Sequence, residues 1–236
     1  MSDPTPHSFE GRATDQLPLA LAELHRSLPV GATATLDLPA SLSPGRRDDL
    51  IVGAGFGVAS PIDATVLVER LHTLPDTVGP DLRVVFCGLN PSRHAADAGV
   101  GFVSPSNRFW PAALAAGLVS VDRDPFHALR QHGVGMTDLV KRATTKASEV
   151  TVDEFRDGLG RLERLVGWLQ PGALCLVGLA GWRQAVDRRA SAGWQSPGVG
   201  GVPVYVMPST SGLNASSQLP DFVEHLRALS AGPDRR

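Results

Sequence analysis

Apolar runs alternate with segments of helical periodicity from residue 83 almost to the end of the chain. Residues 83–89 (RVVFCGL), 173–179 (ALCLVGL) and 202–208 (VPVYVMP) are nearly continuous apolar runs. Such runs are typical of strands that are buried on both faces of a parallel sheet. Because helical segments separate them, we expect a three-layer α/β/α fold around a short, mostly parallel sheet.

The helical segments carry their own signals. In residues 150–170 apolar side chains recur at three- and four-residue steps, and Thr151 with Glu154 predicts a capping box at the start of the helix. Residues 107–118 predict a helix with Pro111 in its first turn, where proline is tolerated. Further helices are expected over 180–190 and 217–230.

The first eighty residues have a less regular pattern. Residues 15–28 predict a short amphipathic helix, 32–38 a strand, and 43–56 a turn and a helix that ends at Gly53 or Gly55. Residues 65–72 fit a strand or a helix equally well. Pro75, Gly79 and Pro80 make residues 73–83 the best linker in the chain.

These patterns divide the chain into four parts. The first part is rich in Pro, Ser, Asp and Thr, as disordered segments are. We expect a disordered lead-in over 1–15, a small α/β extension over 16–80, a larger domain over 81–230 and a tail over 231–236.

Composition narrows the class of protein. A hydrophobic share of 42% with 19% charged residues is ordinary for a globular protein with a full core. No apolar run is long enough for a transmembrane helix, and the polar, acidic N-terminus does not resemble a secretory signal. Cys87 and Cys175 lie in strand-like runs, so we interpret them as buried thiols in a reducing cytoplasm. Without a CxxC pair, a zinc ribbon or a four-cysteine iron–sulfur cluster is excluded, and we expect no metal or cofactor.

The net charge of −2 conceals an asymmetry between the two parts of the chain. Residues 1–80 carry 5 Lys/Arg against 10 Asp/Glu, and residues 81–236 carry 17 against 14. The larger segment is therefore the better candidate for an anionic partner.

Two polar loops follow predicted strands. Ligands of open parallel sheets bind outside the carboxyl ends of the strands, where residues 88–92 (GLNPS) and 207–214 (MPSTSGLN) lie. Neither loop is a GxGxxG or Walker sequence, so the usual nucleotide-cofactor interpretations fail. We interpret GAGFG at 53–57 as a helix C-cap and turn.

Three ordered blocks carry a resemblance to a known family: residues 83–92 (RVVFCGLNPS), 99–110 (GVGFVSPSNRFW) and 206–215 (VMPSTSGLNA), with support from 133–144 (GVGMTDLVKRAT). They resemble the mismatch-specific uracil/thymine DNA glycosylases, a branch of the uracil-DNA glycosylase superfamily. The resemblance covers about residues 81–230. It implies the fold of that superfamily and hydrolysis of the N-glycosidic bond of uracil opposite guanine in double-stranded DNA, which leaves an abasic site. Thymine and modified pyrimidines are further candidate substrates.

The resemblance also assigns roles to residues of the first loop. Asn90 would hold the attacking water against C1′ of the extruded nucleotide. An amide has no useful titratable proton, so Asn90 implies a slow enzyme that relies on positioning and electrostatics. Backbone N–H groups around Leu89 and Phe102 would receive the charge of the departing base, and the Phe102 ring would stack on it. Ser92 would narrow the pocket against the methyl group of thymine.

The second loop is implied to contact DNA. Leu213 would enter the duplex and fill the space that the extruded base leaves, and Gly212 would permit close backbone approach. Ser209 would contact the sugar or the 5′ phosphate, and Ser211 belongs to the same DNA-binding loop. Asn214 and Ala215 stand where many members of the family have Ser-Arg. Three other residues are interpreted without a DNA-contacting role: Asn107 as a helix cap, Arg108 as a surface charge, and Asp138 as a replacement for the lysine of some relatives.

Alternatives remain open at this point. The protein is either such a glycosylase or a nucleic-acid-binding module with little catalysis on the same scaffold; a metabolic enzyme on a doubly wound sheet is the third possibility. No lysine stands in either loop, so we expect no Schiff-base lyase step. Residues 16–80 faintly resemble the C-terminal portion of class I methyltransferases and are interpreted as a fused remnant. We expect a cytoplasmic, nucleoid-associated monomer.

Overall fold

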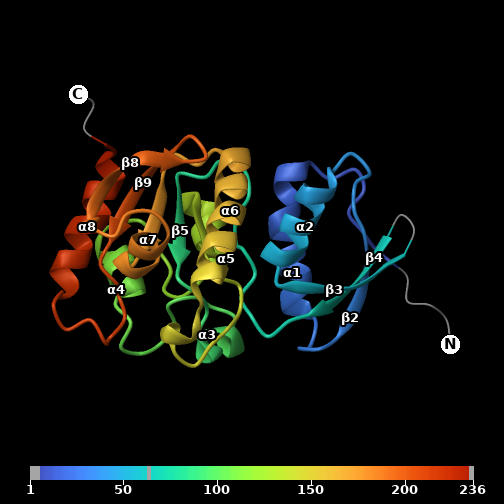
Figure 1. Cartoon of the computed structure of the whole chain (residues 1–236), viewed down its shortest axis with the longest axis horizontal. Helices are drawn as coiled ribbons and strands as arrows, with labels where there is room; N and C mark the ends of the chain where they lie inside the picture. The colour runs from blue at the N-terminus through green and yellow to red at the C-terminus, as the bar shows by residue number, and fades with distance from the viewer. Residues whose placement is uncertain (1–5, 63–64, 234–236) are drawn as a thin grey trace.

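Two α/β units lie side by side along the long axis of the molecule (Figure 1). The computed structural model describes residues 6–62 and 65–233. The N-terminal unit has a four-stranded sheet of order β1-β2-β4-β3, and the larger unit has a five-stranded sheet of order β6-β5-β7-β9-β8. In the larger sheet β6, β5, β7 and β9 are parallel to one another, and the edge strand β8 is antiparallel to β9.

The elements of the N-terminal unit are β1 (His7–Ser8), η1 (Thr14–Gln16), α1 (Leu17–Ser27), β2 (Thr33–Asp37), α2 (Pro44–Gly53), β3 (Phe56–Ile62) and β4 (Thr65–Arg70). Those of the larger unit are β5 (Val84–Gly88), α3 (Arg93–Ala98), α4 (Phe109–Ala115), α5 (Pro125–His132), β6 (Val134–Asp138), η2 (Ala147–Glu149), α6 (Val152–Leu169), β7 (Leu174–Val177), α7 (Leu179–Ala185), β8 (Gly193–Val199), β9 (Val202–Met207) and α8 (Leu219–Ala231).

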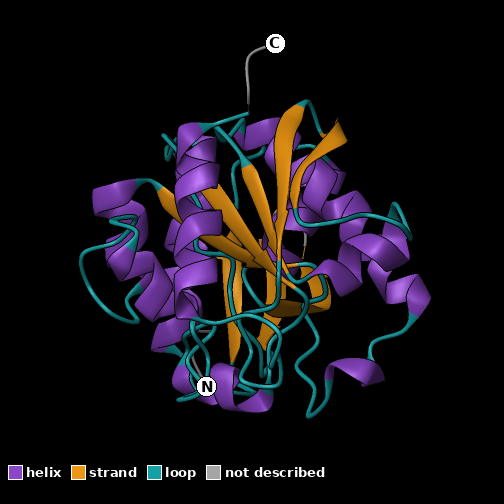
Figure 2. Ribbon diagram, turned by 90° about the vertical axis from the view of Figure 1, so that its left-hand side faces the viewer, coloured by secondary structure: helices purple, strands orange, loops and turns teal. Residues whose placement is uncertain are grey.

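The larger sheet is covered by helices on both faces, as Figure 2 shows. Along β5, Val85 and Cys87 point into a core shared with α6 and α7. Val84 and Phe86 point the other way, into a core shared with α4 and α8. Burial on both faces explains why β5, β7 and β9 are continuous apolar runs. The predicted three-layer fold with a mostly parallel sheet and an N-terminal α/β unit is therefore confirmed.

Several local predictions are also confirmed. Residues 83–89, 173–179 and 202–208 contain β5, β7 and β9. Helix α6 begins with the capping box of Thr151 and Glu154. Residues 65–72, for which the sequence allowed a strand or a helix, contain the strand β4. The described elements that the pattern missed are β1, β3, β6, β8, α3, α5 and η2.

The chain ends differ from the expectation. Residues 7–8 pair with β2 and Phe9 is buried, so the part of the lead-in that the structure describes is ordered. Residues 1–5 of the lead-in lie outside the described residues. Helix α8 extends to Ala231, which was assigned to the tail, and residues 234–236 lie outside the described residues. None of the helices that the structure describes is both long and apolar enough to cross a membrane.

The segment 73–83 connects β4 of the N-terminal unit with β5 of the larger unit, but it is not an exposed linker. Residues 73–79 are buried, and Thr77 pairs with Met136 of β6 through two backbone hydrogen bonds of 2.8 Å. Its centre is Asp76, whose carboxylate lies 2.6 Å from the Arg161 guanidinium and 2.9 Å from the Lys141 ammonium. Although its prolines and glycines are typical of an exposed linker, most of this segment is buried between the two units.

Asp76 is ionised in the folded protein. Burial would raise its pKa, but the charges of Arg161 and Lys141 and the hydrogen bond from Thr137 outweigh burial and hold the pKa below its usual range. A buried carboxylate that is paired in this way is costly to break, because the partner charge stays behind without compensation.

Replacing Asp76 by Ala should therefore lower the free energy of unfolding by about 3–5 kcal/mol. The measurement is urea unfolding at pH 7, with Asp153→Ala as the matched control, because Asp153 forms an exposed pair with Arg156. The contribution of Asp76 is complete at neutral pH and is lost as the pH falls below about 4, since its pKa is lower in the folded chain than in the unfolded chain. Equal stability of the two variants would contradict the role given to Asp76.

Candidate active site

A cavity of about 270 Å³ opens where β5 and β6 end. Its wall includes the chain that follows β5, Asp138 at the end of β6, the loop after β9, and Leu74, Pro75 and Thr77 of the segment between the units. Of the residues assigned from the sequence, Leu89, Asn90, Ser92, Phe102, Ser209 and Ser211 line this cavity. Gly212, Leu213 and Asn214 are on the adjoining part of the loop, outside the cavity lining.

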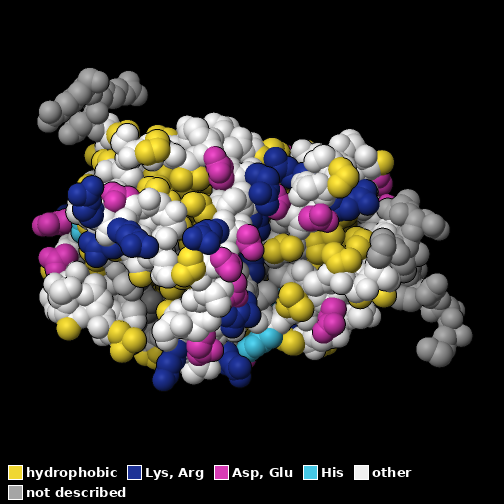
Figure 3. Space-filling model, in the orientation of Figure 1, with side chains coloured by type: hydrophobic (Ala, Val, Ile, Leu, Met, Phe, Trp, Pro, Cys, Tyr) yellow, Lys and Arg dark blue, Asp and Glu magenta, His cyan; other side chains and the backbone are white. Residues whose placement is uncertain are grey.

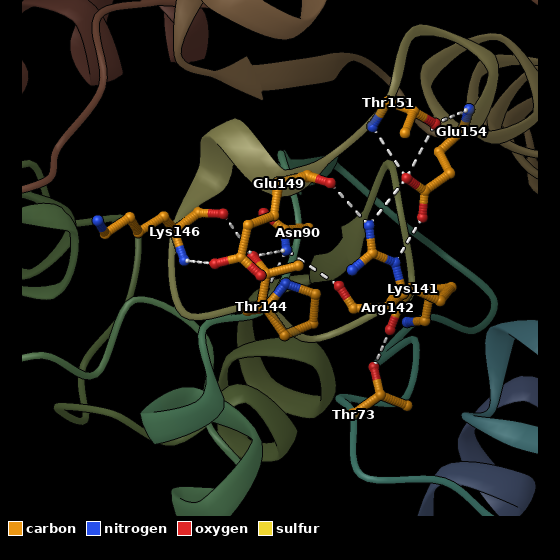
Figure 4. A network of polar contacts seen from close by, with 10 residues as sticks. Thr73, Asn90, Lys141, Arg142, Thr144, Lys146, Glu149, Thr151 and Glu154 are labelled. Atoms are coloured by element: carbon orange, nitrogen blue, oxygen red, sulfur yellow. Dashed lines mark hydrogen bonds and ion pairs between the residues drawn. The ribbon is translucent and has the colours of Figure 1, made fainter.

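The Asn90 amide is held in one orientation. Its Nδ2 donates to the hydroxyl of Thr144 at 2.8 Å and to the carbonyl of Arg142 at 3.0 Å (Figure 4). The Thr144 hydroxyl uses its own proton to bind the carbonyl of Lys146 at 2.9 Å, so it can only accept from Asn90. This direction fixes the nitrogen of the amide on the Thr144 side and leaves Oδ1 as the acceptor for a molecule in the cavity.

The loop that holds Asn90 is itself fixed to helix α6. The Arg142 side chain donates to both carboxylate oxygens of Glu154, at 2.6 and 2.9 Å, and to the carbonyl of Glu149 at 2.9 Å. Figure 4 shows these contacts continuing from Asn90 to Glu154. The hydrogen bonds from Arg142 lower the pKa of Glu154 to about 2. Glu154 therefore stays ionised, and paired with Arg142, well below neutral pH.

Phe102 forms an aromatic wall of the cavity. One face of its ring stacks on Phe109, with 4.4 Å between the ring centroids and 25° between the planes. Its backbone is left-handed, with φ of 58°, a conformation that a phenylalanine adopts at a cost. The preceding turn is held by a hydrogen bond of 2.8 Å from the Trp110 indole to the carbonyl of Gly101. Strain of this kind is found where a side chain must point in a set direction.

Ser92 lines the cavity and is also the N-terminal cap of helix α3. Its hydroxyl accepts the N–H of Ala95 at 3.1 Å and caps α3. This hydrogen bond holds the Ser92 side chain in one conformation, close to Asn90 in the cavity wall.

The loop after β9 is held by Arg108. The guanidinium donates to the carbonyls of Ser211, Asn214 and Ser217 at 2.6–2.7 Å. Arg108 is half-buried and lies over the ring of Phe222, so its interpretation as a surface charge was wrong. The side chain of Asn107 does cap α4, through a bond of 2.9 Å to the N–H of Phe109.

At the tip of this loop Leu213 is 96% exposed. Gly212 lies so close to Ser106 that a Cβ atom there would overlap the serine side chain. Asn214 bonds within the loop, from Nδ2 to the carbonyl of Ser209 at 2.7 Å. The loop is therefore a compact structure that presents one apolar side chain to solvent.

Asp138 is the titratable side chain among the described residues of the cavity lining. Burial raises the pKa of its carboxyl to about 6, with Lys141 acting in the opposite direction. From the sequence, Asp138 is noted as a substitution without a role, Arg108 is interpreted as a surface charge, and Thr144 is not singled out. No local signal marks the contacts of Thr144 and Arg108, because their partners lie about fifty and one hundred positions away.

Residues 75–230 match the family model of the uracil DNA glycosylase superfamily. The match includes both loops, Phe102 and Asp138. Membership in this superfamily indicates uracil-DNA glycosylase activity on a DNA substrate.

Replacing Arg108 by Met should loosen the loop after β9, since charged hydrogen bonds contribute roughly 1.5–3 kcal/mol each. We expect backbone hydrogen exchange over residues 209–217 to accelerate at least about tenfold, while exchange in β5 and β9 is retained. Arg156→Met is the control, because Arg156 is exposed on α6. Unchanged exchange in the loop would contradict the support assigned to Arg108.

Proposed function

The chain belongs to the uracil DNA glycosylase superfamily, and we propose that it is a monofunctional, mismatch-specific member of it. The proposed reaction is hydrolysis of the N-glycosidic bond of uracil opposite guanine in double-stranded DNA, which leaves an abasic site. Thymine and modified pyrimidines opposite guanine are proposed as slower substrates. The observation that carries the proposal is the fixed amide of Asn90 in a cavity beside the exposed Leu213.

The first step is extrusion of the nucleotide. C1′ is hidden in stacked DNA, so the nucleotide must rotate out of the duplex, and a mismatched pair opens at lower cost. Leu213 supplies an apolar side chain that occupies the vacated space, and Gly212 and Ser106 keep the loop close to the cavity. Lys and Arg side chains on the lower edge of the larger unit (Figure 3), where α3 lies in Figure 1, are suited to the flanking phosphates.

The second step is attack by water. Oδ1 of Asn90 accepts a hydrogen bond from the water and aims its oxygen at C1′. The amide does not remove a proton, so the rate depends on positioning and on charge stabilisation as the sugar becomes cation-like. The base leaves with the negative charge, and the backbone N–H groups of Leu89 and Phe102 are the donors proposed to receive it; the proton that the water loses on bonding to C1′ neutralises the released base through solvent.

The preference for uracil over thymine is proposed to depend on two residues of the cavity wall, Phe102 and Ser92. We propose that the extruded ring stacks on the face of Phe102 opposite Phe109, a contact that tolerates different bases. Ser92, fixed as the cap of α3, reduces the room for the methyl group of thymine. The proposed order of activity is therefore uracil before thymine.

The test uses a duplex with one G:U pair, labelled on the uracil strand, followed by alkali. We expect strand cleavage at the uracil, with less cleavage of an A:U duplex. Asn90→Ala should lower the single-turnover rate on the order of 100-fold or more. DNA binding without cleavage would favour the alternative, a binding module on the same fold.

The same assay tests the orientation of the amide. Thr144→Val removes the hydrogen bond to Asn90 at nearly constant volume, and we expect a rate loss on the order of 10–100-fold. Thr144→Ser keeps the hydroxyl and should retain most of the activity. Equal rates for the two variants would show that the hydroxyl does not orient Asn90.

Leu213→Ala should slow excision from duplex DNA on the order of 10-fold and affect a single-stranded substrate much less, because no base pair has to be opened there. Val58→Ala is the control, since Val58 is also exposed but lies on β3 of the N-terminal unit. An equal loss on both substrates would contradict the insertion of Leu213 into the duplex.

A further inference from the structure

The corner of the cavity next to Phe102 contains a carboxyl group. Asp138 ends β6 and lies beside Gly88, the last residue of β5. A Cβ atom on Gly88 would be 2.5 Å from Oδ1 of Asp138 and 3.5 Å from Cζ of Phe102. A base that stacks on Phe102 therefore has its edge within reach of Asp138, and only a glycine at position 88 leaves the carboxyl room to stand there.

The carboxyl of Asp138 has its hydrogen-bonding capacity free. Within residues 6–62 and 65–233, the hydrogen bonds to Asp138 go to its backbone carbonyl, from Arg161 at 2.9 Å and from Thr137 at 3.4 Å. Asp138 is half-buried, and its carboxyl oxygens face the open cavity and not the closed interior. A carboxyl that faces a cavity without a hydrogen-bond partner is suited to bind a ligand.

Charged neighbours bear on Asp138 from several elements. Lys141, from the loop after β6, is already paired with Asp76, and Arg161 of α6 binds the other oxygen of Asp76. The thiol of Cys87 on β5 is a further neighbour. Burial, opposed by Lys141 and then reinforced by Asp76, raises the pKa of Asp138 to about 6. The carboxyl is thus neutral in mild acid and ionised in mild base.

We propose that Asp138 reads the extruded base as a neutral carboxyl, with its hydroxyl donating to O4 of uracil and its carbonyl oxygen accepting from N3–H. This inference rests on the proposed glycosylase activity and names the group that selects the base. The match is one of hydrogen-bond chemistry. The edge of uracil presents one acceptor beside one donor, and a neutral carboxyl presents the complementary pair.

The ionised form lacks this complementarity. A carboxylate only accepts hydrogen bonds, so it would face O4 of uracil with a negative charge and no donor, in a site with little water. Binding of uracil then requires that the carboxyl take up a proton. An asparagine at position 138 would offer the same donor and acceptor at any pH.

The test is single-turnover excision of uracil from the G:U duplex between pH 5 and pH 8. For the parent protein we expect a rate about 100-fold lower at pH 8 than at pH 5, because the neutral fraction falls tenfold for each pH unit above the pKa. Asp138→Asn should remove most of this decline and exceed the parent rate at pH 8. An inactive Asp138→Asn, or one that keeps the parental pH profile, would overturn the proposal; the first result would assign Asp138 to proton abstraction.

A second readout does not depend on activity. Because the pKa of Asp138 is higher in the folded chain than in the unfolded chain, stability falls as the pH rises from about 4 to about 6, and the full loss remains at higher pH. Asp138→Asn should therefore raise the melting temperature relative to the parent at pH 8, and the difference should shrink at pH 4.5. A melting difference that does not change with pH would also overturn the proposal. Failure of the parent to excise uracil at any pH would instead refute the proposed function, and the melting curves would still report on Asp138.

Discussion

The cavity depends on one constraint, which is that four neighbouring strands run in the same direction. β6, β5, β7 and β9 end at one edge of the sheet, so the loops that follow them meet there. Residues that are remote in sequence become neighbours at this edge: Asn90 contacts Thr144, and Arg108 contacts Ser211. An antiparallel arrangement would divide the same loops between two edges. The parallel direction of these strands therefore brings the loops of the site together, and the side chains act within that arrangement.

Hydrogen bonds then give each loop a fixed shape. The Lys146 carbonyl orients the Thr144 hydroxyl, and that hydroxyl orients Asn90. Arg108 joins three carbonyls of the loop that carries Leu213. Asn90 cannot supply a proton-accepting group of useful basicity, so the proposed chemistry relies on geometry, and geometry is what these bonds maintain. Leu213 at the tip of its loop is almost fully exposed, and an exposed apolar side chain at a rigid loop tip is suited to contact a partner.

The sequence predicted those parts of the fold whose signals are local. β5, β7 and β9 are apolar over their whole length, and α6 has both periodicity and a capping box. β6 was missed because it contains a glycine and ends in polar residues, and α3 was missed because it has only 6 residues. The motifs located the loops of the site, whereas the partners that orient them were not visible. The order of 73–79 escaped detection because it depends on Asp76 meeting an arginine 85 positions away.

The N-terminal unit is attached by more than that segment. Arg164 of α6 forms an ion pair with Asp49, and Arg46 lies over the ring of Trp168, 4.2 Å from its centroid. Trp168 packs against the cores of both units, and none of these four residues is part of the cavity lining. The likeness of this unit to methyltransferases and the boundary at residue 80 stay predictions.

The most direct test of the central claim is a crystal structure with a G:U duplex whose uridine carries a 2′-fluorine, which slows cleavage. The expected result is an extruded uracil against Phe102, Leu213 in the space that the uracil left, and Oδ1 of Asn90 bound to a water next to C1′. A stacked uracil, or Asn90 and Leu213 on different nucleotides, would contradict the claim that the two loops act on one nucleotide.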